Sequence, residues 1–275
     1  MSLTELSDAL GANRSTILNI VRQLVDAGWL RKSDRQYLLG PGLIPLGRAA
    51  ESGAEGVLYA RAELGQLAAN LGVGATATAL AGDAIVVVDS LGGTSGRPSS
   101  LLVGQRLPAV PPSGSLFVAS DEDASARWIA AVTDWPEEKR LRLMRALDAI
   151  RERKFSVERL TPSSLHVRTL VAELGAAVMS DEFRSSIVGL IEDLGTMEYL
   201  EVEFDPGATY PVSYIAAPVF SREGSVVLTI ALHLLREVDG AEIDRIGQQL
   251  LRVADRVSQE VQRANGAIPS LADQP

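Results

Sequence analysis

Residues 2–41, SLTELSDALGANRSTILNIVRQLVDAGWLRKSDRQYLLGP, decide the fold of the N-terminal part of the chain. Leucines at helical spacing predict a short helix that ends at Gly11, and the Asn/Ser cap at Asn13 predicts a second, amphipathic helix. Gly28 is expected to end that helix because glycine readily adopts a positive φ. Two short strands around a turn at residues 33–35 then predict a hairpin. This order of elements predicts a winged helix–turn–helix.

A winged helix–turn–helix places the N-terminal residues of its second helix in the major groove of DNA. Asparagine suits adenine, arginine suits guanine, and serine and threonine donate to bases or phosphates. Cations on the wing would contact phosphates. The alternative is that this part is only a solvated surface or a dimerisation domain. We expect double-stranded DNA (an operator) as a partner, contacted by Asn13, Arg14, Ser15, Thr16, Asn19, Arg22, Arg31, Lys32 and Arg35.

The composition is typical of a soluble, cytoplasmic protein with two domains. The chain has 275 residues, of which 46% are hydrophobic, enough for two cores. It has no cysteine and two histidines, which argues against disulfides, a thiolate nucleophile and a metal site. It shows neither a secretory leader nor an apolar run that could span a bilayer, so no membrane partner is expected.

The negative charge lies outside the predicted DNA-binding part. The net charge is −9, but residues 1–50 hold six basic and four acidic groups, giving +2, which leaves −11 for residues 51–275. The acidity of the whole chain therefore does not argue against DNA binding by its N-terminal part. A dimer would double the phosphate contacts of this modestly charged part.

The chain resembles the IclR family of bacterial transcriptional regulators over most of residues 2–160 and 199–262. The resemblance implies a homodimer or dimer of dimers and a C-terminal GAF-like effector domain, whose ligands in the family are often small organic acids. It also implies a helix before Ser2, so we expect either a true start upstream of Met1 or a loosely packed DNA-binding domain, and it implies an arginine where this chain has Asn19. The matching blocks are SLTELSDALGANRSTI, LVDAGWL, YLLGPGLIPLG, VGQRLPAVPPSGSLFVA and SYIAAPVFSREGSVVLTIAL.

The remaining pattern predicts an α+β effector domain made of an antiparallel sheet and helices. We expect strands at 75–80, 84–91, 101–107, 198–204, 212–220 and 226–234, and helices at 57–71, 112–119, 124–131, 137–154 and 241–264. Residues 160–197 are expected to add a helical hairpin. The predicted domains are 1–41 for DNA binding, 42–56 as linker helix and hinge, 57–265 for the effector, and 266–275 as a disordered tail.

One face of the strand at 226–234 is expected to line an effector pocket. Thr229, Ala231 and His233 alternate on a face that is smaller and more polar than the opposite one. Ser113, Gly114 and Ser115 open a predicted helix whose free backbone amides could hold a carboxylate. The resemblance adds Tyr214. The alternatives are a structurally satisfied strand-end histidine and a tyrosine of the core or of a dimer surface.

These patterns predict a ligand-responsive DNA-binding transcriptional regulator whose effector is a small organic acid. The chain contains none of the nucleophile-elbow, zinc-protease or phosphate-loop motifs, so no catalytic residue, cofactor or metal is expected. One alternative is a sensor or scaffold protein with impaired DNA binding. A second is a ligand-binding domain with weak hydrolase activity at Ser113 or Ser115.

Overall fold

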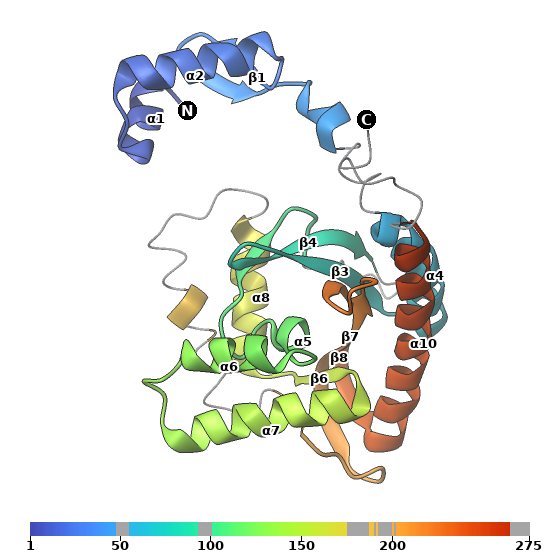
Figure 1. Cartoon of the computed structure of the whole chain (residues 1–275). Coiled ribbons are helices and arrows are strands. Elements are labelled where there is room, and N and C mark those ends of the chain that lie inside the picture. Colours follow the sequence, from blue (N-terminus) through green and yellow to red (C-terminus); the bar gives the residue numbers. More distant parts are fainter. Residues whose placement is uncertain are drawn as a thin grey trace, which may run out of the picture. The chain divides into compact units, whose positions relative to one another are not determined.

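The chain divides into two compact units, Met1–Glu55 and Gly56–Pro275, both drawn in Figure 1. The computed structural model describes residues 1–47, 55–92, 101–174, 187–189, 191, 200 and 202–264. The predicted tail at 266–275 lies outside these residues. Of the predicted linker, residues 43–47 are helical, Gly56 lies inside the next helix rather than in a hinge, and residues 48–54 are outside the description.

The two helices of the first unit begin and end where their capping residues predict. Helix α1 (Leu3–Leu10) has a capping box in which Ser2 and Glu5 bond each other's backbone N–H, and it ends at Gly11 with a φ of 57°. Helix α2 (Arg14–Asp26) begins behind Asn13. Gly28, with a φ of 72°, turns the chain away from it. The predicted helix–turn–helix is confirmed.

A two-stranded antiparallel wing follows α2. Strands β1 (Leu30–Ser33) and β2 (Gln36–Leu39) pair with Leu30 opposite Leu39. The turn is one residue shorter than predicted, because Ser33 still pairs with Gln36 and only Asp34 and Arg35 connect the strands. Asp34 has a φ of 53°, a conformation that aspartate tolerates better than most residues.

The first unit buries little apolar surface. Among residues 1–47, the buried hydrophobic side chains are Ile17 and Val21, both on α2. Leu10 and Ile20 are 65% and 48% exposed. The unit therefore depends on its caps and on close backbone packing beside this small core.

A six-stranded antiparallel sheet forms the centre of the second unit, in the order β5-β4-β3-β8-β7-β6 (Figure 1). The two longest strands, β7 and β8, pair along nearly their whole length and carry Tyr214, Thr229 and His233. The strands are β3 (Gly74–Ala81), β4 (Ala84–Leu91), β5 (Arg106–Pro108), β6 (Ser156–Arg159), β7 (Thr209–Phe220) and β8 (Val226–Asp239).

Helices α4 (Glu55–Leu71) and α10 (Gly240–Ala264) lie side by side at one side of the sheet (Figure 1). Helix α10 packs on β7 and β8, and its expected inward residues Ile243, Ile246 and Leu250 are fully buried. An ion pair between Arg256 and Glu63 joins the two helices. The amphipathic pattern of the closing helix thus predicts its packing correctly.

The other helices are α5 (Ser115–Val118), α6 (Glu122–Ala130), α7 (Glu137–Arg153) and α8 (Pro162–Leu174). Helix α5 contacts both β7 and β8, and it also packs against α6 and α7. Helix α8 corresponds to the start of the predicted helical hairpin. Of the second predicted helix, residues 187–189 and 191 are helical, and the rest of the hairpin lies outside the described residues.

Three predicted elements differ from the structure. Residues 101–105 are not a strand, because Gly104 has a φ of 90° and the Gln105 side chain accepts a hydrogen bond from the N–H of Leu102. The helix at 112–119 is only the four residues of α5. The predicted strand at 198–204 is not formed at residues 202–204, which pair with no other strand of the described chain. Leu200 forms one isolated β-bridge to Glu158.

No helix in the described part of the chain combines the length and the apolar character needed to cross a membrane.

Candidate functional site

All nine residues predicted to contact DNA are exposed on the first unit. Arg14, Ser15 and Thr16 form the first turn of α2, behind the cap residue Asn13. Asn19 and Arg22 follow on the same helix. This arrangement presents the N-terminal half of α2 to solvent, as reading the major groove requires.

The side chain of Asn13 is committed to the helix cap. Its Oδ1 accepts hydrogen bonds from the backbone N–H of Ser15 at 2.8 Å and from the Ser15 hydroxyl at 2.6 Å. Two bonds occupy both lone pairs of an amide oxygen, so Asn13 cannot also pair bidentately with adenine. Its free donor group suits a phosphate instead.

The cations of the first unit carry uncompensated charge. Within residues 1–47, none of them forms an ion pair with another described residue. Arg31 and Lys32 are successive on β1 and therefore project from opposite faces of the wing. The structure thus does not bring every predicted wing contact to one face. The cations are Arg14, Arg22, Arg31, Lys32 and Arg35.

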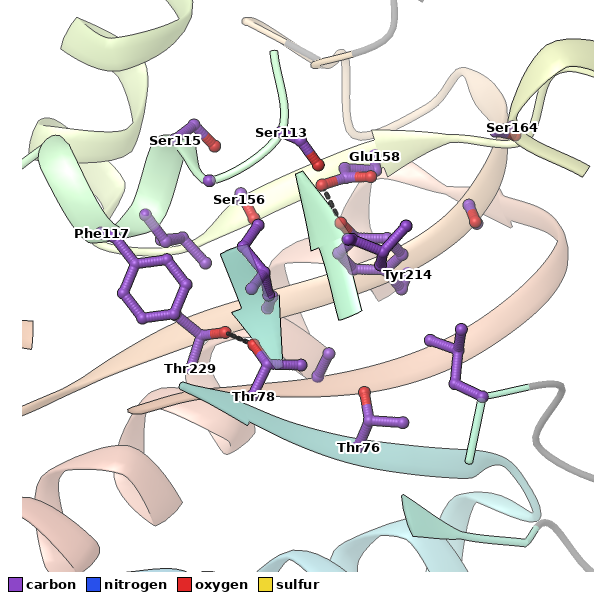
Figure 2. Close-up of a pocket in the computed structure, with 18 of the residues that line it drawn as sticks. Thr76, Thr78, Ser113, Ser115, Phe117, Ser156, Glu158, Ser164, Tyr214 and Thr229 are labelled. Atoms are coloured by element: carbon purple, nitrogen blue, oxygen red, sulfur yellow. Dashed lines mark hydrogen bonds between the residues drawn. The ribbon is translucent and has the colours of Figure 1, made fainter. Parts of the chain in front are cut away.

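A cavity lies between α5 and the sheet of the second unit, with an empty volume of about 930 Å³ that includes its open mouth. Figure 2 shows its side chains coming from β3, β6, β7, β8 and α5. Apolar walls come from β4, β5 and α5, including Ile85, Leu107 and Phe117. All seven residues predicted to bind an effector line this cavity: Ser113, Gly114, Ser115, Tyr214, Thr229, Ala231 and His233.

Hydrogen bonds connect polar side chains across the floor of the cavity. Oγ1 of Thr76 lies 2.9 Å from Nε2 of His233, and the hydroxyls of Thr78 and Thr229 lie 2.7 Å apart. The His233 side chain is thus held by a neighbouring strand. These contacts join β3 to β8 and leave the floor polar but ordered.

A second polar pair joins β6 to β7. The Tyr214 hydroxyl donates to the buried carboxylate of Glu158, as the dashed line in Figure 2 shows. The Tyr214 ring also meets His233 edge to face, with centroids 5.6 Å apart. Glu158, Tyr214 and His233 therefore follow one another across three adjacent strands, in register.

The structure does not support the prediction that Ser113, Gly114 and Ser115 bind a carboxylate through the N-terminus of a helix. Helix α5 has only four residues, and its N-cap, Gly114, has a φ of 87° and provides no side-chain cap. A single turn has almost no macrodipole to offer an anion. The three residues line the cavity as loop and side-chain groups.

The sequence prediction missed the cavity residues of β3 and β6. Thr76 and Thr78 alternate in a strand otherwise made of glycine, alanine and leucine, a period-two signal that could have been read. Ser156 and Glu158 also alternate, but on the short β6, for which no strand was expected. Ser164 and Ser213 line the cavity as well.

The described residues contain no group of three or more histidines or carboxylates that could hold a metal ion. Among the cavity residues that the structure describes, there is likewise no lysine or arginine. Glu158 and His233 are therefore the titratable groups of the described lining, together with the phenol of Tyr214.

Comparisons with known proteins agree with this architecture. Residues 1–34 match the model of the IclR helix-turn-helix domain. An IclR transcriptional regulator from Alicyclobacillus acidocaldarius is 22% identical, over 94% of this chain and 90% of that one, with a TM-score of 0.64. HmgR from Pseudomonas aeruginosa is 18% identical over 95% and 91% of the two chains, with a TM-score of 0.60.

A similar structure also comes from Silicibacter, an IclR-type regulator 14% identical over 98% of this chain and 91% of its own, with a TM-score of 0.60. A comparison with curated proteins finds no match. At these identities the solved structures show the fold, and the family model shows the kind of N-terminal domain. The resemblance to the IclR family is thereby confirmed: this chain has the family's helix–turn–helix domain at its N-terminus and the fold of IclR transcriptional regulators.

Proposed function

We propose that the protein is a homo-oligomeric transcriptional regulator that binds operator DNA and responds to a small molecule. The observation that carries this proposal is the exposed first half of α2, with Arg14, Thr16 and Asn19 free to reach base edges. Uncompensated cations on α2 and the wing supply the phosphate contacts that hold such a motif on the duplex.

We assign effector binding to the cavity of the second unit. The cavity is concave, is walled by apolar side chains, and carries a few ordered polar groups, which is typical of small-molecule sites. Effector binding would change the equilibrium between two conformations of the regulator. The free energy of that change cannot exceed the difference between the effector's binding free energies to the two conformations. The seven predicted residues, Ser113 to Ser115, Tyr214, Thr229, Ala231 and His233, all belong to this site.

The carboxylate of an acidic effector is expected to lie away from Glu158. Two carboxylates about 5 Å apart repel each other by about 3 kcal/mol even at an effective dielectric constant of 20. An acidic effector would therefore turn its carboxylate toward the loop at Ser113 and Ser115.

Fluorescence anisotropy with a labelled duplex from upstream of the protein's own gene tests the proposal. We expect the wild-type chain to bind this duplex better than a scrambled duplex of equal length. Arg14→Ala should reduce that preference, because an arginine–guanine pair contributes about 1–3 kcal/mol of discrimination. Equal binding of both duplexes by the wild-type chain would refute the proposal.

The small core of the first unit favours one alternative, a sensor whose DNA binding is impaired. With Leu10 and Ile20 exposed, this unit buries few apolar side chains. The alternative predicts a folded second unit that binds ligands, together with no operator binding with or without them. The same anisotropy experiment, paired with a ligand-dependent melting shift, separates the two.

A further inference from the structure

The hydroxyl of Ser156 is a buried group without a partner at the cavity. Ser156 is 1% exposed and lines the cavity, and its Oγ has no hydrogen-bond partner among the described residues. A buried hydroxyl left unbonded costs stability, so its presence in a folded protein calls for an explanation. At the wall of a cavity, the partner that can come and go is a ligand.

Glu158 lies two residues along the same strand and faces the same cavity. The two Cα atoms of an i, i+2 pair are about 7 Å apart, and one ligand group can fit between their side chains. Glu158 already accepts a hydrogen bond from Tyr214, which shows that its carboxylate acts as an acceptor in this site. A carboxylate has about four lone-pair positions, so it can accept from a ligand donor as well.

We infer that Ser156 and Glu158 select an effector that carries a hydroxyl group at this end of the cavity, an inference that rests on the cavity's proposed role as the effector site. A hydroxyl can accept from the Ser156 Oγ–H and donate to the Glu158 carboxylate at the same time. A ketone and a carboxylate can only accept, so neither can donate to Glu158. The effector is thus a small alcohol with an apolar body.

The apolar body fits the other walls of the same cavity. Ile85, Leu107, Leu116 and Phe117 line it from β4, β5 and α5, whereas Ser156 and Glu158 approach from the opposite edge strand, β6. A compact ring or branched chain with one hydroxyl matches this division between apolar and polar walls.

Melting curves and titration calorimetry on the full chain without DNA test this inference with three probes on one ring: cyclohexanol, cyclohexanone and cyclohexanecarboxylate. We expect cyclohexanol to bind at least about fivefold more tightly than cyclohexanone, a difference of about one hydrogen bond. The carboxylate cannot donate to Glu158 either, and should also bind more weakly than cyclohexanol. Equal or tighter binding of the ketone or of the carboxylate, or no binding of cyclohexanol, would overturn the inference.

Ser156→Ala separates ligand contact from a structural role. Because the hydroxyl has no partner among the described residues, its loss should leave the melting temperature of the free protein unchanged or higher, while cyclohexanol affinity falls about tenfold. Ser7→Ala is the matched control: Ser7 has the same kind of buried, unpartnered hydroxyl, but in α1. Unchanged cyclohexanol affinity in the Ser156→Ala protein would contradict the assignment.

Glu158→Gln provides a second test that a general loss of folding would not mimic. The glutamine oxygen can still accept from Tyr214, but its amide can now donate to a carbonyl. We expect the preference for cyclohexanol over cyclohexanone to shrink or reverse. A preference unchanged from wild type would remove Glu158 from the selection of the hydroxyl. Because these measurements use no DNA, failure of operator binding would leave their outcome intact.

Discussion

Thr76 holds His233 across two neighbouring strands, with Oγ1 and Nε2 2.9 Å apart. Both side chains are buried at the floor of the cavity. Thr76 faces Ala231 in the ladder, and its hydroxyl reaches diagonally to the imidazole of His233, which lies two residues further along β8, opposite Gly74. The histidine therefore serves the fold and lines the site at once.

Thr76→Val should destabilise the second unit by about 1–3 kcal/mol, because it leaves a buried imidazole nitrogen without this partner. Urea unfolding followed by tryptophan fluorescence measures the change. Thr169→Val is a suitable control, since the Thr169 hydroxyl donates to the Leu165 carbonyl of its own helix at an exposed position. Equal effects of the two substitutions would show that the bond to His233 contributes nothing.

Gly40→Ala should unfold or loosen the first unit. A Cβ at residue 40 would lie 2.2 Å from the carbonyl oxygen of Gly28, where no atom can fit unless the backbone shifts. Overpacking of this kind costs about 1–3 kcal/mol, a large loss for a unit with so small a core. Gly47→Ala, which meets nothing within 4 Å, is the control. Hydrogen exchange of residues 1–47 should rise only in the Gly40→Ala protein.

Arg35→Ala should weaken DNA binding on every sequence alike. Arg35 lies in the exposed wing turn and has no ion-pair partner among the described residues. Losing one phosphate contact should reduce the salt slope of binding by about one. Arg142→Ala removes an equal charge from α7, where it pairs with Glu138, and should not change the slope. A slope unchanged by Arg35→Ala would exclude the wing turn from the interface.

The junction of β8 and α10 should be sensitive to acid. Hydrogen bonding from Arg236 holds the pKa of Glu242 below its ordinary value. A lowered pKa in the folded protein stabilises it above the ordinary carboxyl pKa, and this stabilisation disappears as the pH falls through the lower, folded value. Arg236→Gln should therefore lower the melting temperature at pH 7, and the difference from wild type should shrink at acid pH. A difference that grows on acidification would contradict this.

The first unit could be predicted from its sequence because its signals are local. Asn13, Gly11 and Gly28 mark helix ends by their own chemistry, and the structure places the ends there. The base preference of the first unit could not be predicted from its sequence in the same way. Asn13, for example, is committed to Ser15 at the cap, which only the geometry reveals.

The cavity was only half predictable, because its residues come from strands far apart in the chain. The alternation of Thr229, Ala231 and His233 is visible in β8 alone. Strand β6 has four residues, and what makes it a strand is its pairing with β7, more than fifty residues later. Ser156 and Glu158 were therefore missed together with the strand that holds them.

The loop before the cavity misled the sequence prediction for a physical reason. Residues 101–107 have the apolar content of a strand, but the positive φ of Gly104 and the side-chain bond of Gln105 fold the first five residues into a turn. Leu101 and Leu107 still reach the cavity. Leu101 is buried and Leu107 half-buried, whereas Leu102 and Val103 are exposed, and only Arg106–Pro108 pair as a strand.

A salt titration of DNA binding tests the central claim most directly. Anisotropy of the upstream duplex would be followed between about 50 and 200 mM KCl, with the wild-type chain. Five uncompensated cations in each first unit predict that the logarithm of the affinity falls linearly with the logarithm of the salt concentration, with a slope of roughly −4 or steeper. An affinity that does not change with salt would contradict the account.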